Sequence, residues 1–222
     1  MSADHVIAID GPAASGKSSV ARTLARRLGF CYVNSGAMYR AVTWRALQHR
    51  IAVQDPDAVA ALAERARIVC ELIDGESRIS IGNFDPSPQL HSDEVNRAVS
   101  SVSRVPRVRE IINLQMRQCV AGRDVVIEGR DIGSVVFPET PFKFFLDASP
   151  EVRAGRRNAQ GQRDEIAMRD QADSSRQTAP LVIAPDAERI DTSALTIPEV
   201  VEEILKRLRA KGLSSTAVNS HR

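Results

Sequence analysis

One stretch near the N-terminus has the residue types and spacing of a phosphate-binding loop. Residues 11–18 read Gly-Pro-Ala-Ala-Ser-Gly-Lys-Ser and match G-x-x-x-x-G-K-[ST] at every fixed position. The glycines of this motif let backbone N–H groups close around phosphate oxygens, Lys17 reaches the β- and γ-phosphates, and the Ser18 hydroxyl ligates Mg²⁺. The sequence therefore predicts a nucleoside triphosphate site. The residues expected to form it are Gly11, Ala13, Ala14, Ser15, Gly16, Lys17, Ser18 and Ser19.

The segments on either side of the loop are those that the motif needs. The apolar run 6–9 predicts a buried strand, and apolar residues at helical spacing predict a helix over 18–28. A helix that starts at the loop brings the positive end of its dipole to the phosphates. Gly29 is well placed to end this helix, and residues 30–33 predict a second parallel strand, so the fold class is α/β.

Residues 51–103 depart from a simple alternation of strands and helices. A helix is expected over 57–66, and the apolar runs 68–73 and 78–81 flank Asp-Gly-Glu-Ser, a turn sequence typical of a β-hairpin. Ser92 can cap a further helix. This mixture predicts an α+β insertion into the core.

The rest of the chain predicts three more strands and three more helices. The strands are expected over 124–127, 142–146 and 187–192, and the helices over 106–121, 150–159 and 197–209, the last with Ile197, Val200, Val201, Ile204, Leu205 and Leu208 on its buried side. Charged residues follow the strands that end at Ile127 and Leu146. Because the carboxyl ends of parallel strands meet at one edge of the sheet, we expect these charges beside the phosphate loop.

Composition limits the remaining possibilities. The 222 residues suffice for one well-cored domain with insertions, and a formal net charge of +2 gives no reason to expect nucleic acid or an anionic membrane. No apolar run approaches the ~20 residues of a membrane helix, and the N-terminus does not resemble a signal peptide, so a cytoplasmic location is expected. Cys31, Cys70 and Cys119 form no C-x-x-C pair and are interpreted as reduced thiols.

A phosphate loop alone is compatible with a GTPase, a nucleic-acid motor, a small-molecule kinase or a nucleotide sensor. The D-x-x-G and N-K-x-D segments of common GTPases do not occur in the expected places, and motors usually need a longer chain. A small-molecule kinase instead needs a second pocket and several arginines, because phosphoryl transfer depends on positioning and charge stabilisation.

Four further motifs follow the loop in chain order. They are Asn-Ser-Gly-Ala-Met-Tyr-Arg at 34–40, Pro-Arg-Val-Arg at 106–109, Glu-Gly-Arg-Asp-Ile-Gly at 128–133, and Arg-Asp at 169–170 with Asp173 and Arg176 ahead of Ala-Pro-Leu at 179–181. With the loop, these motifs make the chain resemble the bacterial-type cytidylate kinases over about residues 6–208. The resemblance implies transfer of the γ-phosphoryl group of ATP to CMP or dCMP, with Mg²⁺, by a monomer.

The resemblance also implies a three-layer phosphate-loop nucleoside monophosphate kinase fold, with a five-stranded parallel sheet, a monophosphate-binding insert and a short lid. We expect the core at 1–33, 104–152 and 179–212, the insert at 34–103, the lid at 153–178, and a disordered tail at 213–222.

The resemblance also implies contacts to the acceptor nucleotide, first to its phosphate and its base. Ser35 and Arg40 match contacts to the acceptor, the latter at its phosphate, and Ser100, Arg109 and Asp131 match positions that hold the pyrimidine. A carboxylate can accept a hydrogen bond from the amino group of cytosine while arginine and serine donate to the ring acceptors. Uracil reverses the pattern at its 4-position, so such a site would reject UMP by leaving polar groups unpaired.

Lys17 and three arginines are expected to lie around the phosphoryl group that is transferred. Arg130 and Arg176 match ligands of the acceptor phosphate, and Arg169 matches a lid arginine near the donor phosphates. Asp173 matches a contact to the sugar hydroxyl. Guanidinium groups suit these places because they bind phosphate oxygens in pairs and reduce the repulsion between two anions.

Two rival functions and two structural alternatives stay open at this point. The chain could phosphorylate another small acceptor, or it could be an ATP-binding regulatory module without turnover, since the stretch 157–169 is some ten residues shorter than the resemblance leads us to expect. Arg40, Arg130 and Asp131 could instead form structural ion pairs. Ser100 and Arg109 could lie on a solvated helix face.

Overall fold

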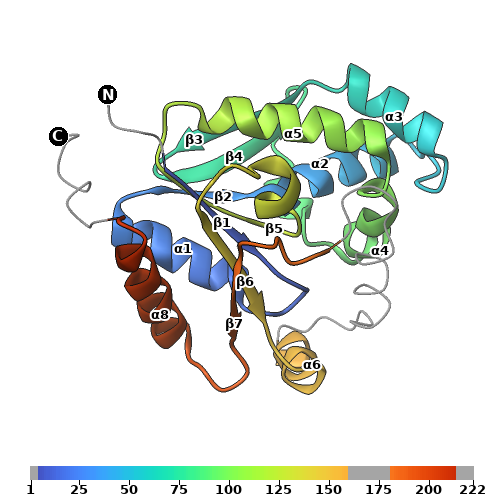
Figure 1. Ribbon diagram of the computed structural model, residues 1–222. Coiled ribbons are helices and arrows are strands. Elements are labelled where there is room, and N and C mark those ends of the chain that lie inside the picture. The colour runs from blue at the N-terminus through green and yellow to red at the C-terminus, as the bar shows by residue number, and fades with distance from the viewer. Residues whose placement is uncertain (1–4, 160–180, 214–222) are drawn as a thin grey trace.

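The fold is organised by a seven-stranded sheet with the strand order β3-β4-β2-β5-β1-β6-β7 (Figure 1). The computed structural model describes residues 5–159 and 181–213. The strands are β1 Val6–Asp10, β2 Cys31–Asn34, β3 Ile68–Ile73, β4 Glu76–Ile81, β5 Val125–Gly129, β6 Phe142–Asp147 and β7 Glu188–Asp191. The helices include α1 Lys17–Leu28, α2 Ser35–Gln48, α3 Pro56–Arg65, α4 Asp93–Val102, α5 Pro106–Val120, α6 Pro150–Ala159 and α8 Ile197–Ala210. Two shorter elements are the 3-10 helix η1 Ser87–Gln89 and the π-helix η2 Ile132–Val136.

Five of the strands form the parallel sheet that the sequence predicts. Strand β1 pairs with β5 and β6, β2 pairs with β5, and β6 pairs with β7, all in parallel. Alternate residues of β1 point to opposite faces: Ile7 and Ile9 pack with α1 and α8, whereas Ala8 packs with α2 and α5. Helices on both faces make the expected three-layer α/β fold (Figure 1).

The other two strands come from the predicted hairpin, which extends the core sheet. Strands β3 and β4 are antiparallel and meet at the turn of Asp74 and Gly75, both with positive φ. Tyr32 of β2 lies opposite Glu76 and donates its N–H to the Gly75 carbonyl at 2.8 Å. The hairpin therefore adds two strands to the five of the expected parallel sheet. The edge of β2 exposes backbone groups that the hairpin satisfies, and this pairing has no local sequence signal.

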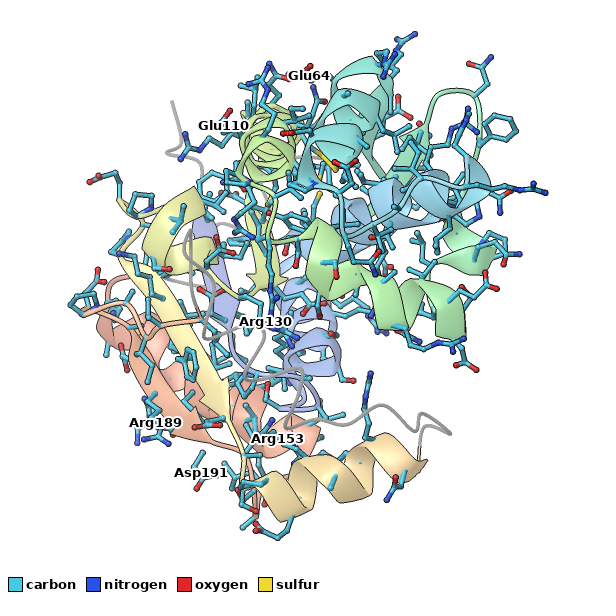
Figure 2. All side chains as sticks on the ribbon, turned by 90° about the vertical axis from the view of Figure 1, so that its right-hand side faces the viewer. Glu64, Glu110, Arg130, Arg153, Arg189 and Asp191 are labelled. Atoms are coloured by element: carbon cyan, nitrogen blue, oxygen red, sulfur yellow. A yellow bond between two sulfur atoms is a disulfide. The ribbon has the colours of Figure 1, made fainter. Side chains whose placement is uncertain are left out.

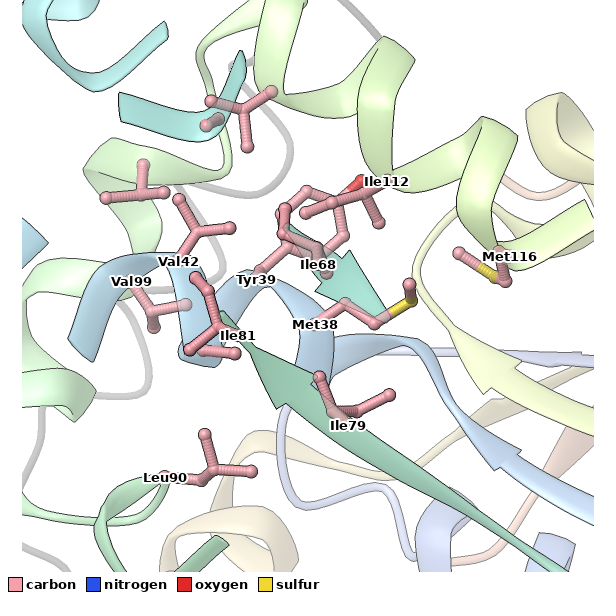
Figure 3. Close-up of a cluster of buried hydrophobic side chains, with 14 of the residues drawn as sticks. Met38, Tyr39, Val42, Ile68, Ile79, Ile81, Leu90, Val99, Ile112 and Met116 are labelled. Carbon is pink, nitrogen blue, oxygen red and sulfur yellow. The ribbon is translucent and has the colours of Figure 1, made fainter. Parts of the chain in front are cut away.

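The elements around the hairpin share a hydrophobic cluster, which Figure 3 shows from close by. It brings together side chains of α2, α4, α5 and the hairpin, including Met38, Tyr39, Val42, Ile81, Val99 and Ile112. Both Met38 and Tyr39 belong to the same motif as Ser35 and Arg40. Burial of this apolar face therefore fixes the helix that carries two of the predicted acceptor residues.

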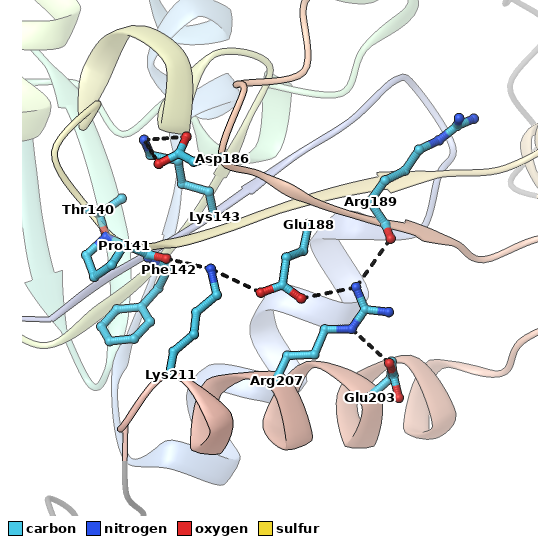
Figure 4. A network of polar contacts seen from close by, with 10 residues as sticks. All are labelled: Thr140, Pro141, Phe142, Lys143, Asp186, Glu188, Arg189, Glu203, Arg207 and Lys211. Atoms are coloured by element: carbon cyan, nitrogen blue, oxygen red, sulfur yellow. Dashed lines mark hydrogen bonds and ion pairs between the residues drawn. The ribbon is translucent and has the colours of Figure 1, made fainter.

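Polar contacts hold β7 against its neighbours at the other end of the sheet (Figure 4). Glu188 accepts from Lys211 at 3.0 Å and from Arg207 at 3.3 Å, and Lys211 also donates to the Pro141 carbonyl at 2.9 Å. Isolated partly exposed pairs contribute little stability, but these contacts share partners on β7, α8 and the segment before β6. They fix the position of the residues that follow β7.

Two sequence predictions were wrong in detail. Cys70 of β3 and Cys119 of α5 form a disulfide with a Cα–Cα distance of 5.6 Å, and only Cys31 is a free thiol. The two cysteines are 49 residues apart in sequence, and only the packing of α5 on β3 makes them neighbours. Ile197 is 41% exposed because it is the first residue of α8, ahead of the turn that reaches the core.

Side chains cap two of the helices that position the site. The side chain of Asn34 accepts from the Ala37 N–H at 3.2 Å and caps α2, which begins at Ser35. The Ser92 side chain likewise caps α4 by accepting from the Val95 N–H. In the described part of the chain, no helix has the length and apolar character needed to cross a membrane.

Candidate active site

A cleft of about 280 Å³ opens at the carboxyl ends of β1, β2 and β5. The predicted residues that line it are Ala13, Ala14, Gly16, Lys17, Ser18, Ser19, Ser35, Arg40, Ser100, Arg109, Arg130 and Asp131. Gly11 and the buried Ser15 belong to the same loop but do not line the cleft. Arg169, Asp173 and Arg176 lie outside the described residues. The structure thus brings the two predicted groups of residues to one cavity.

The phosphate loop has the backbone geometry of an anion nest. Gly16 has φ 89° and Ala14 has φ 59°, so left-handed residues alternate with others and turn successive N–H groups to one side. A Cβ at Gly11 would collide with the Leu146 carbonyl oxygen of β6. The buried Lys17 donates to the Pro12 carbonyl at 3.0 Å, within its own loop. The loop is therefore a compact cationic cradle at the start of α1.

Arg109 and Asp131 form a buried ion pair on the opposite side of the cleft. Arg109 is 4% exposed and Asp131 5%, and the Arg109 Nη2 donates to the carboxylate. The same guanidinium donates to the Ser103 carbonyl at 3.1 Å and lies 5.4 Å from the ring centroid of Tyr39. The solvated-face alternative for Arg109 is therefore wrong. Its orientation is fixed by groups from three different elements.

Arg40 is held in the same half of the cleft by contacts from α4 and the turn before it. Its Nη1 donates to the Leu90 carbonyl at 2.8 Å and to the Asn96 Oδ1 at 2.7 Å. The Asn96 side chain donates in turn to the His91 carbonyl at 2.9 Å. These bonds satisfy part of a buried guanidinium, and they make its direction depend on how α4 packs against α2.

The segment after β5 joins the two halves of the cleft. Gly129 lies against Ser35: a Cβ there would lie 2.7 Å from the Ser35 Oγ and 2.7 Å from the Ile132 side chain. The Ser35 hydroxyl donates to the Glu128 carbonyl at 2.8 Å. Arg130 follows and lines the cleft; its label lies near the centre of the view in Figure 2. Close approach of β5 and α2 therefore requires a glycine.

Asp10, at the end of β1, was not predicted from the sequence, and it holds the segment that follows β5. Its carboxylate accepts from the N–H groups of Ile132 at 2.8 Å and Gly133 at 2.8 Å. Burial raises the pKa of Asp10 to about 6; the two amide bonds and Arg130 oppose the rise, and Asp131 adds to it. Since Asp10 directly precedes Gly11, one carboxylate links the phosphate loop to the segment that follows β5. A carboxylate at the end of a buried strand was the available signal.

Glu128 is a second missed residue. It is buried, lines the cleft, and accepts from the Tyr32 hydroxyl at 3.0 Å. Burial raises the pKa of Tyr32, and the neighbouring carboxylate raises it further, so this phenol stays a neutral donor. Other cleft residues that were not predicted are Asn34, Gly36, Tyr39, His91, Val99, Ser103, Gly129 and Arg157. Several of these lie within the recognised motifs, next to residues that were named.

The cleft offers few side-chain oxygens that could bind a metal ion, and this suits a metal that takes few ligands from the protein. Across residues 5–159 and 181–213 there is no group of three or more His, Cys, Asp or Glu that could hold a metal ion. Mg²⁺ typically binds through one or two protein oxygens together with substrate phosphates and water. The Ser18 hydroxyl at the start of α1 and the Glu128 carboxylate both line the cleft and fit that requirement.

A family profile and the sequences of known proteins match this chain and carry the same description. The profile of the family described as cytidylate kinase matches residues 7–210. The cytidylate kinase of Caldanaerobacter subterraneus is 42% identical over 214 residues, which is 91% of this chain and 94% of the relative. The cytidylate kinases of Mycobacterium avium and Mycobacterium leprae are 43% and 44% identical, over 95% and 94% of this chain and 98% and 97% of the relatives.

Proposed function

Because the chain belongs to the cytidylate kinase family, we propose that it is an ATP-dependent kinase that phosphorylates CMP or dCMP to CDP or dCDP. One observation carries the proposal: a buried pair, Arg109 with Asp131, faces the same cleft as the phosphate loop. A phosphate loop alone supports ATP binding. The pair supports a second nucleotide whose base offers both hydrogen-bond donors and acceptors.

The donor half suits ATP with Mg²⁺. The nest of the loop, the α1 N-terminus and Lys17 supply positive potential where the β- and γ-phosphates would lie. Ser18 and Glu128 would hold the metal directly or through water, and the metal when bound neutralises charge on the phosphate oxygens. Tyr32 would keep the Glu128 carboxylate in place through its 3.0 Å hydrogen bond.

The acceptor half suits cytosine better than uracil. The Asp131 carboxylate would accept from the cytosine amino group, while Arg109 and Ser100 would donate to the ring acceptors. Uracil carries an oxygen in place of that amino group, so it would face a buried carboxylate with no donor. Leaving both groups unpaired in a buried site costs binding free energy, and this is the expected basis of discrimination.

The reaction itself would need positioning more than proton transfer. The acceptor phosphate is already a nucleophile, so no side chain need act as a strong base. Arg40 and Arg130 would hold the acceptor phosphate and Lys17 would stabilise charge on the transferred group. Arg169, Asp173 and Arg176 keep their proposed contacts to the donor phosphates, the sugar hydroxyl and the acceptor phosphate.

The remaining expectations form part of the same proposal. The partners would be small nucleotides rather than nucleic acid, and the enzyme would be a cytoplasmic monomer. Sedimentation of the purified protein tests the oligomeric state, and fractionation of source cells tests the location. The disulfide between Cys70 and Cys119 means that cysteine content gives no support for a reducing compartment.

An acceptor panel tests the proposed function. ADP release would be followed with ATP and Mg²⁺ and with CMP, dCMP, UMP, AMP or GMP as acceptor. We expect turnover with the two cytidine nucleotides far above the others. A preference for another acceptor would favour a different small-molecule kinase. Calorimetric ATP binding without turnover on any acceptor would favour a regulatory module, and either result would contradict the proposal.

A further inference from the structure

Four consecutive carbonyl groups of the phosphate loop each accept a hydrogen bond from a side chain. Lys17 donates to Pro12 at 3.0 Å, Arg153 to Ala13 at 3.4 Å, Arg156 to Ala14 at 3.4 Å, and Thr192 to Ser15 at 2.9 Å. Only Lys17 belongs to the loop. The other three donors are two residues of α6 and the residue that follows β7. These two segments lie next to each other, as Figure 2 shows where Arg153 and Asp191 are labelled, and Arg156 contacts Thr192.

Thr192 makes the shortest of these contacts and is itself held in place. It is 2% exposed, and its hydroxyl oxygen lies 2.9 Å from the Ser15 carbonyl and 3.0 Å from the Asp147 carbonyl. The Asp147 carbonyl already accepts from the Thr192 N–H at 2.8 Å. A hydroxyl has a single proton, so we assign it to Ser15, the shorter contact. Arg156 donates to the hydroxyl oxygen at 3.1 Å.

The loop needs such support because its backbone is strained. Ala14 has φ 59°, a left-handed conformation that is unfavourable for a residue with a Cβ. Conformations of this kind persist only where the surroundings hold them. The C=O and N–H of one planar peptide point in opposite directions. A donor that holds the Ser15 carbonyl away from the cleft therefore turns the N–H of Gly16 toward it.

We propose that Thr192 is a positioning residue of the donor site. Its hydroxyl holds the peptide between Ser15 and Gly16 so that the Gly16 N–H faces the donor phosphates. The inference rests on the proposed function only in taking ATP as the ligand of the loop. Thr192, which is 177 positions from Ser15 in sequence, is therefore expected to affect the binding of ATP and not the binding of the acceptor.

The test compares three proteins by calorimetric titration with ATP and Mg²⁺ in the absence of acceptor. Thr192→Val keeps the shape of the side chain and removes the hydroxyl, and we expect ATP to bind about tenfold more weakly, equivalent to ~1.4 kcal/mol. Thr192→Ser restores the hydroxyl and should bind ATP within about twofold of the wild type. The affinity for CMP, measured in a separate calorimetric titration, should stay within about twofold of the wild type in both variants.

Thr43→Val is the matched control. Thr43 is completely buried, and its hydroxyl donates to the Tyr39 carbonyl at 2.8 Å within α2, away from the loop. We expect this variant to lower the melting temperature and leave ATP affinity unchanged. If Thr192→Val cannot be purified folded, Thr192→Ala replaces it in the same comparison.

Three results would overturn the inference. They are unchanged ATP affinity in Thr192→Val, equal weakening of ATP and CMP, and failure of Thr192→Ser to restore ATP binding. Because the titration needs no turnover, it is independent of the acceptor panel. A wild type that binds ATP and phosphorylates no cytidine nucleotide would contradict the proposed function and still allow Thr192 to be tested.

Discussion

The two halves of the cleft are built in different ways. The donor half is made by one continuous stretch, residues 11–19, between β1 and the first turn of α1. The acceptor half is made by side chains from α2, α4, α5 and the segment after β5. In the proposed function the donor half would bind with backbone amides and one lysine, whereas the acceptor half would use buried charged side chains. Local sequence is therefore enough for the first, and the second exists only after the chain has folded.

This difference also sets how each half fails. A buried charge must keep its partner, because removing one member of a buried pair leaves the other uncompensated. Arg109 and Asp131 come from positions 22 residues apart, and Arg40 and Asn96 from positions 56 apart. Disturbing α4 or α5 should therefore damage acceptor recognition before it damages the loop. Separate effects on ATP and on the acceptor are the observable consequence.

The largest expected effect comes from the donor half. Lys17→Met removes the cation proposed to stabilise the transferred group and should lower kcat about 10³-fold, in line with the loss of one preorganised electrostatic contact. Calorimetric titration should find CMP affinity unchanged within about twofold. Comparable losses in kcat and in CMP affinity would mean that the two halves are not separable.

The next effect concerns Asp10, which links the halves. Its pKa of about 6 in the folded protein lies above the ordinary 3.8, so folding disfavours the ionised form. Its contribution to stability is therefore present below about pH 4 and is lost as the pH rises through about 6. Relative to Asp10→Asn, the wild-type free energy of unfolding should fall by about 3 kcal/mol between those limits.

Urea unfolding of both proteins at several pH values measures this difference. The variant serves as the reference for the wild type, because all other titrating groups are common to both proteins and their contributions cancel. If the free energy of unfolding of the wild type minus that of Asp10→Asn does not change with pH, the Asp10 pKa is not raised. If the wild type instead becomes more stable relative to the variant as the pH rises, the pKa is lowered.

A smaller effect is expected where the halves touch. Gly129→Ala would place a Cβ against Ser35 and Ile132, and overpacking of this kind costs about 2 kcal/mol. Gly155→Ala is the control, since a Cβ at that position in α6 meets nothing within 4 Å and alanine favours helices. Thermal unfolding should show a loss for the first variant and a small gain for the second. Equal behaviour would remove the argument for close packing of β5 on α2.

The same contrast explains what could be predicted from the sequence. The loop, its flanking strand and helix, the cap at Ser92 and the five parallel strands all have local signals, namely periodicity, caps and a fixed motif. The acceptor residues were named through resemblance to a family. Their pairing, in which Arg109 binds Asp131, emerged only from the packed structure.

What the sequence could not give depends on contacts between remote segments. The hairpin joins β2 through backbone pairing, which any strand edge can offer. Cys70 meets Cys119 because α5 packs on β3. Asp10 and Thr192 are ordinary strand-end residues until their partners are known. Each of these cases is a long-range contact whose residue types carry no distinctive pattern.

The most direct test of separate halves is the ratio of kcat/KM for CMP over UMP in the wild type and in Asp131→Ala, with ATP affinity measured alongside. We expect the ratio to fall about 10²-fold, because the carboxylate proposed to distinguish the two bases is gone, and ATP affinity to stay within about twofold. Measuring below the melting temperature of both proteins separates recognition from stability. An unchanged ratio, or an equal loss of ATP affinity, would contradict the base-reading role of Asp131.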